Sequence, residues 1–351
     1  SAAVQSTNEQ VLKNVNRLGI STDQMIEVAK EVEKIGSNSF SELILGLPGD
    51  TKEAHFKSAS ELMDIGINII RSHQFNMLPA SNAATKENRE KYGLVTRFRV
   101  APSTSNTYHL FGENFCAPEI DEICVQNNSM SFNDYLECRR FNLTIEIFYN
   151  YNLFQELFKF LEGYDISASS TILEIHNQIN KYDSLSKIYD GFLKETQEVW
   201  ETESELRSFL QQPGVIERYQ SKELGNNEQL FYRALAILQE MGSLHEITFN
   251  VAKELLIKKN CFNDQVSNYL RELAEFNLLR KKDILAVDTN AKQTFHYDFT
   301  KLLDCNFNTD PLSCYKPEGI DLFFSYSNEQ KKFISKYLEI YGSSTHGRSF
   351  V

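Results

Sequence analysis

The segment that decides the fold is residues 41–51, which read SELILGLPGDT. Its run Leu43-Ile44-Leu45 is continuously apolar, as expected of a parallel strand that is covered on both faces. Gly46 follows directly and indicates that the strand ends there. Beyond it, Asp50 and Glu53 have the spacing of a helix-capping pair. The segment therefore predicts a buried strand, a tight loop and the start of a helix.

Strand and helix signals alternate on both sides of this segment. Ala2–Val4 and Ile67–Ile70 are short apolar runs of strand type, and the second extends towards Phe75. Helices are expected between them from capping signals, at Thr7 with Gln10, at Ser21 with Gln24, and at Gly36 and Gly66 for the C-terminal ends. A strand–helix–strand–helix–strand order implies a parallel sheet with right-handed crossovers.

The alternation stops near residues 130–150, where the pattern turns helical. We therefore expect two domains, residues 1–130 and residues 131–351, of which the second is mostly helical. Further strands are expected at Val95–Val100 and Glu122–Gln126, and a small β-hairpin at Asp283–Val287 with Thr294–Tyr297. Residues 342–351 are polar and are expected to fray.

Composition restricts the class of protein. The chain has 351 residues, with 36 basic and 48 acidic side chains and a formal net charge of −12. This excess of acid argues against a phosphate-backbone binder and against an anionic membrane surface, so neither a nucleic acid nor a membrane is expected as a partner. The six cysteines are dispersed and lack the spacing of zinc or iron–sulfur ligands. Such cysteines are typical of reduced, buried thiols, which predicts a cytoplasmic location.

Polar residues at the predicted strand ends are the candidate ligand contacts. Gln5 and Ser6 lie where the first strand ends, and Arg17 offers a planar fork that suits a carboxylate. Gly46 permits a flat ligand to approach the backbone closely at the end of a parallel strand. Each also has a plain structural reading. Arg17 would stabilise a helix C-terminus, and Gly46 would belong to an ordinary loop.

His73 lies near the end of the third predicted strand, among the polar residues Arg71, Gln74 and Asn76. A histidine there is suited to acid–base chemistry, and Glu42 is the candidate partner for such a role. A hydrogen-bonded structural histidine is the alternative. The remaining histidines show no metal-ligand spacing.

Several segments together resemble radical SAM proteins that carry an N-terminal cobalamin-binding domain. The resemblance covers residues 1 to about 150 and rests on Ala3-Val4-Gln5-Ser6, Arg17, Leu43–Thr51, Met77-Leu78-Pro79, Arg89–Leu94, Thr96–Val100, Glu119–Ile123, Met130-Ser131 and Asp134-Tyr135. The Gly-Leu-Pro-Gly-Asp-Thr piece is moderately specific, and the ordered set is more so.

The resemblance implies a barrel of six β/α units. In that family a Cys-x-x-x-Cys-x-x-Cys loop holds a 4Fe-4S cluster, which reduces S-adenosylmethionine to a 5′-deoxyadenosyl radical. It further implies that the S-adenosylmethionine contacts are Gln5 and Ser6 at the ribose, Arg17 at the methionine carboxylate, and Ile44, Gly46 and the backbone around Met77 and Leu78 at the adenine. Cobalamin is a further cofactor that the resemblance suggests for the parent protein.

The chain departs from the family pattern because the cluster loop is absent. We therefore expect the C-terminal half of a parallel β/α barrel in residues 1–130, followed by the helical domain, as a fragment of a larger enzyme. Alone it is expected to be inactive and to bind neither the 4Fe-4S cluster nor S-adenosylmethionine. Its expected partners are the missing N-terminal half of the same protein and, through the open strand edge, a second copy.

The turn after Leu78 departs from the family pattern in its sequence. Pro79-Ala80-Ser81 stands where the family has Pro-Gly-Thr, so that turn is expected to differ, because alanine tolerates a positive φ poorly. The alternative to an enzyme fragment is a non-catalytic interaction or scaffold domain on a degenerate barrel. A third reading is another β/α-barrel enzyme that uses His73 and Glu42 as acid and base.

Overall fold

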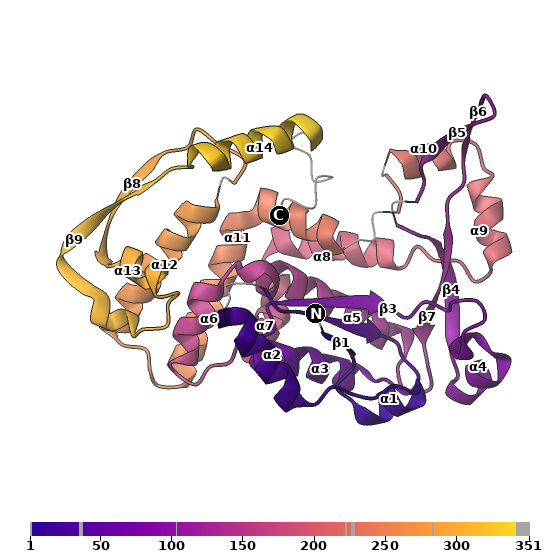
Figure 1. Ribbon diagram of the computed structural model, residues 1–351, viewed down its shortest axis with the longest axis horizontal. Helices are drawn as coiled ribbons and strands as arrows, with labels where there is room; N and C mark the ends of the chain where they lie inside the picture. Colours follow the sequence, from indigo (N-terminus) through magenta and orange to yellow (C-terminus); the bar gives the residue numbers. More distant parts are fainter. Residues whose placement is uncertain are drawn as a thin grey trace. The chain divides into compact units, whose positions relative to one another are not determined.

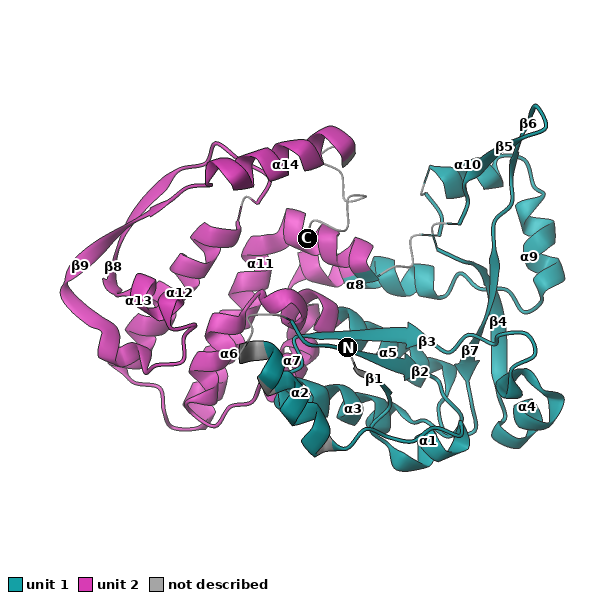
Figure 2. Cartoon of the chain, viewed as in Figure 1, with its two compact units in different colours: residues 1–143, 189–229 teal, residues 144–188, 230–351 magenta. Residues whose placement is uncertain are grey.

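The computed structural model describes residues 2–34, 38–102, 104–221, 223–225, 229–282 and 284–341. The chain divides into two compact units, coloured separately in Figure 2. Unit 1 comprises Ser1–Leu143 and Tyr189–Gln229, and unit 2 comprises Thr144–Ile188 and Leu230–Val351. The sequence-based division at residue 130 stays a prediction.

Unit 1 holds the strands and helices predicted to form the site (Figure 1). Its strands are β1 Ala2–Gln5, β2 Phe40–Leu45, β3 Ile69–Gln74, β4 Val95–Val100, β5 Thr107–Leu110, β6 Glu113–Cys116 and β7 Ile120–Gln126. Its helices are α1 Glu9–Asn14, α2 Thr22–Lys34, α3 Lys52–Ile65, η1 Asn82–Ala84, α4 Lys86–Tyr92, α5 Phe132–Thr144, the end of α8 Asp183–Thr196, α9 Glu203–Leu210 and α10 Val215–Gln220.

Unit 2 is mostly helical and contains one strand pair. Its helices are η2 Ile145–Tyr149, η3 Asn150–Asn152, α6 Gln155–Glu162, α7 Ala168–Gln178, η4 Ile179–Lys181, the first part of α8, α11 Gln229–Lys258, α12 Asp264–Lys281, α13 Phe299–Asp304, η5 Pro311–Cys314 and α14 Asn328–Tyr341. Its strands are β8 Ala291–Tyr297 and β9 Tyr315–Phe324.

The first three strands form a parallel sheet in the order β1-β2-β3. In β2, Leu43 and Leu45 are fully buried, and Leu45 packs in a cluster with Ile123 and Tyr135. Ile44, which alternates with them, is only half-buried. The parallel pairing is confirmed, whereas the expectation that the apolar run is covered equally on both faces is wrong.

The predicted partial parallel barrel is wrong. In the described part of the chain, the strands outside β1–β3 pair antiparallel and two by two, as β4-β7, β5-β6 and β8-β9. The segment after β3 meets β7 in an antiparallel bridge between Asn76 and Ile123. A parallel neighbour would need a crossover of a dozen or more residues, whereas β7 arrives as the return arm of an antiparallel pair. The observed class is mixed α/β.

The helix ends follow the capping signals in part. Ser21 and Gln24 exchange the two hydrogen bonds of a capping box, and Gly66 ends α3 with a φ of 90°. The N-cap of α1 is Asn8 instead of Thr7, because the Thr7 hydroxyl donates to Ser58 Oγ at 3.0 Å. Helix α3 is likewise capped by the side chain of Thr51, not by that of Asp50.

Three further expectations have different outcomes. The hairpin between Asp283–Val287 and Thr294–Tyr297 is wrong, because the second of these segments lies in β8, which pairs with β9. The expected C-cap at Gly36 and the expected frayed tail at residues 342–351 lie outside the described residues.

None of the helices in the described ranges combines the length and the apolar character that crossing a membrane requires.

A buried ion-pair network joins α6 to α12 in unit 2. The carboxylate of Glu156, with 11% of its side chain exposed, accepts hydrogen bonds from Asn277 Nδ2 at 2.9 Å, Arg280 Nη1 at 2.8 Å and Lys281 Nζ at 3.1 Å. Burial by itself opposes the charge of Glu156, but the two cations outweigh it and the pKa of the carboxyl is lowered. Glu156 is therefore charged in the folded protein and ties the two helices together.

We expect Glu156→Ala to lower the free energy of unfolding by about 3–5 kcal/mol, because it leaves Lys281 buried without a counter-ion. Urea denaturation followed by circular dichroism measures the change. The control is Glu162→Ala in the same helix, where the side chain is exposed and the change should stay within about 0.5 kcal/mol. Equal effects of the two substitutions would contradict the role of the network.

Candidate functional site

The candidate site is the edge of the parallel sheet where β1, β2 and β3 end. Because the three strands are parallel, their carboxyl ends meet at one edge, which is where ligands of α/β sheets bind. The predicted site residues lie at or near these ends, and Arg17, which follows α1, reaches the end of β1 through its contact with Gln5: Gln5, Ser6, Arg17, Ile44, Gly46, Met77 and Leu78.

Gln5 and Arg17 lie together at the end of β1. With the Gln5 amide turned so that its oxygen faces Arg17, that oxygen accepts hydrogen bonds from the two terminal guanidinium nitrogens at 3.2 and 3.3 Å. The backbone N–H of Arg17 donates to Leu12 O at 2.9 Å, which fixes the residue after α1. Arg17 is exposed, so the guanidinium is accessible to an anionic group while Gln5 orients it.

Ser6 occupies a different environment from its neighbour. It is 3% exposed, and its hydroxyl accepts a hydrogen bond from the backbone N–H of Asn8 at 3.1 Å. The hydroxyl therefore serves the turn into α1, and it can still donate its own proton. The ribose contact that the resemblance implies for Ser6 stays a prediction.

The loop after β2 is held tightly against the rest of unit 1. Gly46 has a φ of 88°, and a Cβ added there would lie 3.2 Å from the carbonyl oxygen of Cys124 in β7. Side-chain amides fix the next two residues: Asn127 Nδ2 donates to Leu47 O at 3.0 Å and Asn14 Nδ2 donates to Pro48 O at 2.9 Å. Glycine is required at position 46 by both the backbone conformation and the close approach of β7.

Asp50 ends this loop as a buried carboxyl group. It is 1% exposed, and its Oδ1 accepts a hydrogen bond from the backbone N–H of Thr51 at 3.0 Å. Burial raises its pKa from 3.8 to about 7, against the lowering effect of backbone hydrogen bonds from Thr51 and Gly46. Asp50 therefore titrates near neutral pH only while this loop stays folded around it.

Met77 and Leu78 follow β3 and differ in exposure. Met77 is 4% exposed, and its backbone N–H donates to Glu122 O at 2.8 Å. Leu78 is 63% exposed, and its backbone N–H donates to Asn76 O at 3.0 Å. The amide hydrogens of both residues are used inside the chain, so an adenine ring would meet side chains or carbonyl oxygens here. That contact stays a prediction.

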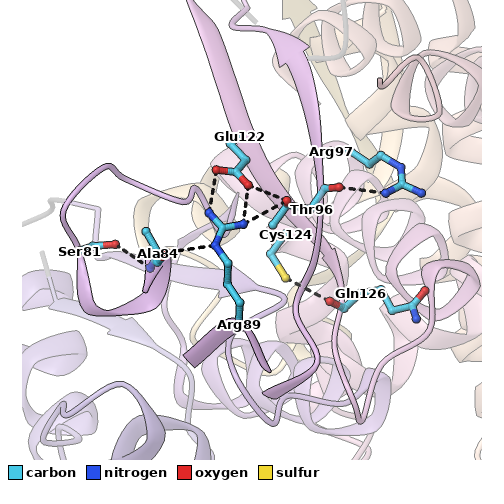
Figure 3. Close-up of polar contacts among 8 residues, drawn as sticks. All are labelled: Ser81, Ala84, Arg89, Thr96, Arg97, Glu122, Cys124 and Gln126. Carbon is cyan, nitrogen blue, oxygen red and sulfur yellow. Dashed lines mark hydrogen bonds and ion pairs between the residues drawn. The ribbon is translucent and has the colours of Figure 1, made fainter. Parts of the chain in front are cut away.

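An Arg–Glu pair braces this edge and was not predicted from the sequence (Figure 3). Arg89 in α4 donates to both carboxylate oxygens of Glu122 in β7, at 2.6 and 2.9 Å, and through Nε to Ala84 O at 3.1 Å. The hydroxyl of Thr96 adds a third hydrogen bond to Glu122 at 2.6 Å. The hydrogen bond from Arg89 holds the pKa of Glu122 below its usual range.

Glu42 and His73 face each other from β2 and β3. Glu42 Oε1 lies 3.1 Å from His73 Nε2, with side-chain exposures of 37% and 54%. They lie on the half-buried side of the sheet together with Ile44, which is in register with His73. The structure therefore brings together the residues named as candidate acid and base. Their catalytic use stays a prediction.

The described residues do not fit an iron–sulfur cluster. Such clusters are held by thiolates, but the six cysteines are unpaired, and no group of three His, Cys, Asp or Glu side chains in the described ranges has the arrangement of a metal site. Cys124 and Cys138 are buried, and burial raises the pKa of Cys124 to about 11. Burial likewise raises the pKa of Cys138, so both side chains are protonated thiols in the core.

Comparison with known proteins gives one informative similarity. The chain is 24% identical over 153 residues to the 2-(S-pantetheinyl)-carbapenam-3-carboxylate methyltransferase of Streptantibioticus cattleyicolor. The match covers 42% of this chain and 21% of the relative, so it spans about a fifth of the length of that protein. No family model matches the chain.

The turn after Pro79 contains a left-handed alanine. Ala80 has a φ of 64°, a conformation that glycine adopts without cost and alanine does not. Alanine therefore bears the strain of a left-handed backbone here. Whether the turn differs from that of the family stays a prediction.

Ala80→Gly should therefore stabilise the protein. Relief of the left-handed strain outweighs the greater chain entropy of glycine in the unfolded state, which gives a gain of about 0.5–1 kcal/mol in urea denaturation. Ala83→Gly, inside η1, is the matched control and should act in the opposite direction. A loss of stability in Ala80→Gly would contradict the strain.

Asp50 gives the site a pH dependence that can be measured. Since its pKa is raised from 3.8 to about 7 in the folded protein, the folded state keeps a proton that the unfolded chain releases between these values. The free energy of unfolding should fall as pH rises through this window, by up to about 1.4 kcal/mol per pH unit. Asp50→Asn should remove this component, as measured by urea denaturation across the window. The exposed Asp23→Asn is the control, and an unchanged slope in Asp50→Asn would count against the assignment.

Proposed function

We propose that this chain is part of a methyltransferase that uses S-adenosylmethionine and belongs to the radical SAM class. The observation that carries the proposal is the 153-residue similarity to a methyltransferase. The motif set of residues 1–150 and the placement of Gln5, Arg17 and Gly46 near the ends of parallel strands support it. The substrate of the relative is not carried over to this chain.

The geometry gives S-adenosylmethionine a partial set of contacts. Arg17 presents an exposed guanidinium, oriented by Gln5, that suits the methionine carboxylate. Gly46 is buried against the carbonyl oxygen of Cys124, so an adenine contact at the end of β2 would fall to the exposed side of Ile44. Ser6 and the amides of Met77 and Leu78 are engaged within the chain, so Arg17 is the residue on which affinity should depend most.

The cluster has to be supplied by another segment, because the described residues hold no thiolate set for it. We therefore assign to this chain the contacts to S-adenosylmethionine and to the missing N-terminal half the cysteine loop, with cobalamin as a second cofactor of the parent protein. The missing half is the proposed partner. The alternative remains a non-catalytic interaction domain that has lost the cluster half altogether.

The decisive experiment extends the chain with the sequence encoded directly upstream of Ser1. The proposal expects a Cys-x-x-x-Cys-x-x-Cys segment there and, after reconstitution with iron and sulfide, cleavage of S-adenosylmethionine to 5′-deoxyadenosine. In the extended protein, Arg17→Ala should weaken S-adenosylmethionine binding by about 10- to 100-fold in calorimetry, the loss expected for a charge-assisted hydrogen bond.

The matched control is Lys13→Ala, which removes an exposed cation of α1 that pairs with Glu9 and should leave affinity unchanged. Equal affinity of Arg17→Ala and the unmodified protein would exclude the carboxylate contact. An upstream sequence without the cysteine triad would exclude the enzyme proposal and favour the interaction domain.

A further inference from the structure

Helix α11 of unit 2 is bent just before a buried histidine (Figure 1). Glu240 has a φ of −125° and a ψ of 24°, which are not helical, so α11 consists of two helical segments that meet there. Gly242 and Ser243 follow, and the hydroxyl of Ser243 donates to Glu240 Oε2 at 2.9 Å. Small residues of this kind allow a helix to change direction. The bend at Glu240 is therefore a place where α11 can hinge.

His245, which follows the bend, is buried among apolar side chains. It is 5% exposed, and the centre of its ring lies 5.0 Å from that of Phe154 and 5.8 Å from that of Phe249. Among the described residues, neither Nδ1 nor Nε2 of His245 has a hydrogen-bond partner. A neutral imidazole carries one donor and one acceptor, so both are buried here at a cost in stability. An aromatic ring without polar atoms would fill the same position without this cost.

The surroundings of His245 oppose a positive charge on its ring. Burial is the main cause, Lys281 at the end of α12 adds to it, and Glu156 in α6 acts in the other direction. These two charged groups are already paired, since Lys281 Nζ lies 3.1 Å from Glu156 Oε2, and Arg280 donates to the same carboxylate. The pKa of His245 is lowered from 6.5 to about 4. A proton on the ring would therefore create a buried cation next to Lys281.

We propose that His245 makes α11 an acid-sensitive latch of unit 2. When the imidazole takes up a proton from the solvent, the turn of α11 that carries His245 moves away from Phe154 and Lys281, with the bend at Glu240 as the hinge. The protonated ring then reaches water, which solvates its charge. The latch is closed at neutral pH and opens as the pH falls. This inference is independent of the proposed methyltransferase function, because the residues that carry it lie in unit 2.

The pH range of the latch follows from the two states of the imidazole. In the open state it takes up a proton near pH 6.5, as an ordinary histidine does, whereas in the closed state it does so only near pH 4. The open state therefore binds more protons throughout this window, and its population rises as the pH falls. Between pH 6 and pH 5 the ratio of closed to open protein should fall about sevenfold. Glu156, whose pKa is lowered, stays charged in this range and does not contribute.

Hydrogen exchange of the full chain between pH 5 and pH 6 tests the latch. After division by the intrinsic exchange rate, the protection of the backbone amides of residues 244–249 should fall about sevenfold from pH 6 to pH 5. His245→Phe removes the titrating group, so it should make this protection independent of pH and raise it at pH 5. His109→Phe, which removes an exposed imidazole from β5, is the matched control and should leave the pH dependence unchanged.

A second variant and a direct titration cover the case in which phenylalanine does not fit the site. His245→Gln keeps polar atoms but takes up no proton in this range, so it should also abolish the pH dependence of the protection. In nuclear magnetic resonance, the imidazole signal that His245→Gln removes should titrate well below pH 6.5 in the unmodified protein. A signal that titrates near pH 6.5 would overturn the proposal. So would protection of residues 244–249 that is constant between pH 6 and pH 5, or a pH dependence that both variants retain.

Discussion

The close approach of Gly46 to the backbone of β7 is the constraint on which the candidate site depends. At this point the parallel sheet and the antiparallel β4-β7 pair meet, with only 3.2 Å between the place of a Cβ and Cys124 O. The contact brings β7 beside the segment that follows β3, where Cys124 N donates to Phe75 O at 2.9 Å. Because interiors are close-packed, any side chain at position 46 would push these strands apart.

The local part of the fold could be predicted from the sequence, whereas the pairing of distant strands could not. Apolar runs and capping residues placed β1, β2 and β3 and gave their parallel order. The barrel failed because nothing local in Glu122–Gln126 distinguishes an antiparallel return from a parallel strand. The partner of β8 was missed for a related reason: β9 contains Pro317 and Gly319, which are typical of loops, and pairs across a long sequence separation.

The residues of the candidate site likewise include some that the sequence predicts and some that it does not. Gln5 and Arg17 were predicted because a strand end and the end of the following helix are close in sequence, and the structure brings them into contact. Glu42 and His73 meet because they are diagonal neighbours on one face of adjacent parallel strands, where Glu42 is in register with Arg71 and His73 with Ile44. The Arg89–Glu122 pair was missed although both residues belong to the segments that carry the family resemblance. Its 33-residue separation is closed only by the antiparallel return of β7.

Asp50 and Glu156 show how the number of donors decides the charge of a buried carboxyl group. Both are largely removed from water, which by itself raises the pKa of each. Asp50 receives backbone hydrogen bonds from Thr51 and Gly46, and burial prevails. Glu156 receives an amide and two cations, and it stays ionised. The network of Glu156 therefore contributes stability that persists at neutral pH, whereas the loop beside Gly46 contains a group that titrates there. Of the two buried carboxyl groups, the one beside the candidate site is the one whose charge changes near neutral pH.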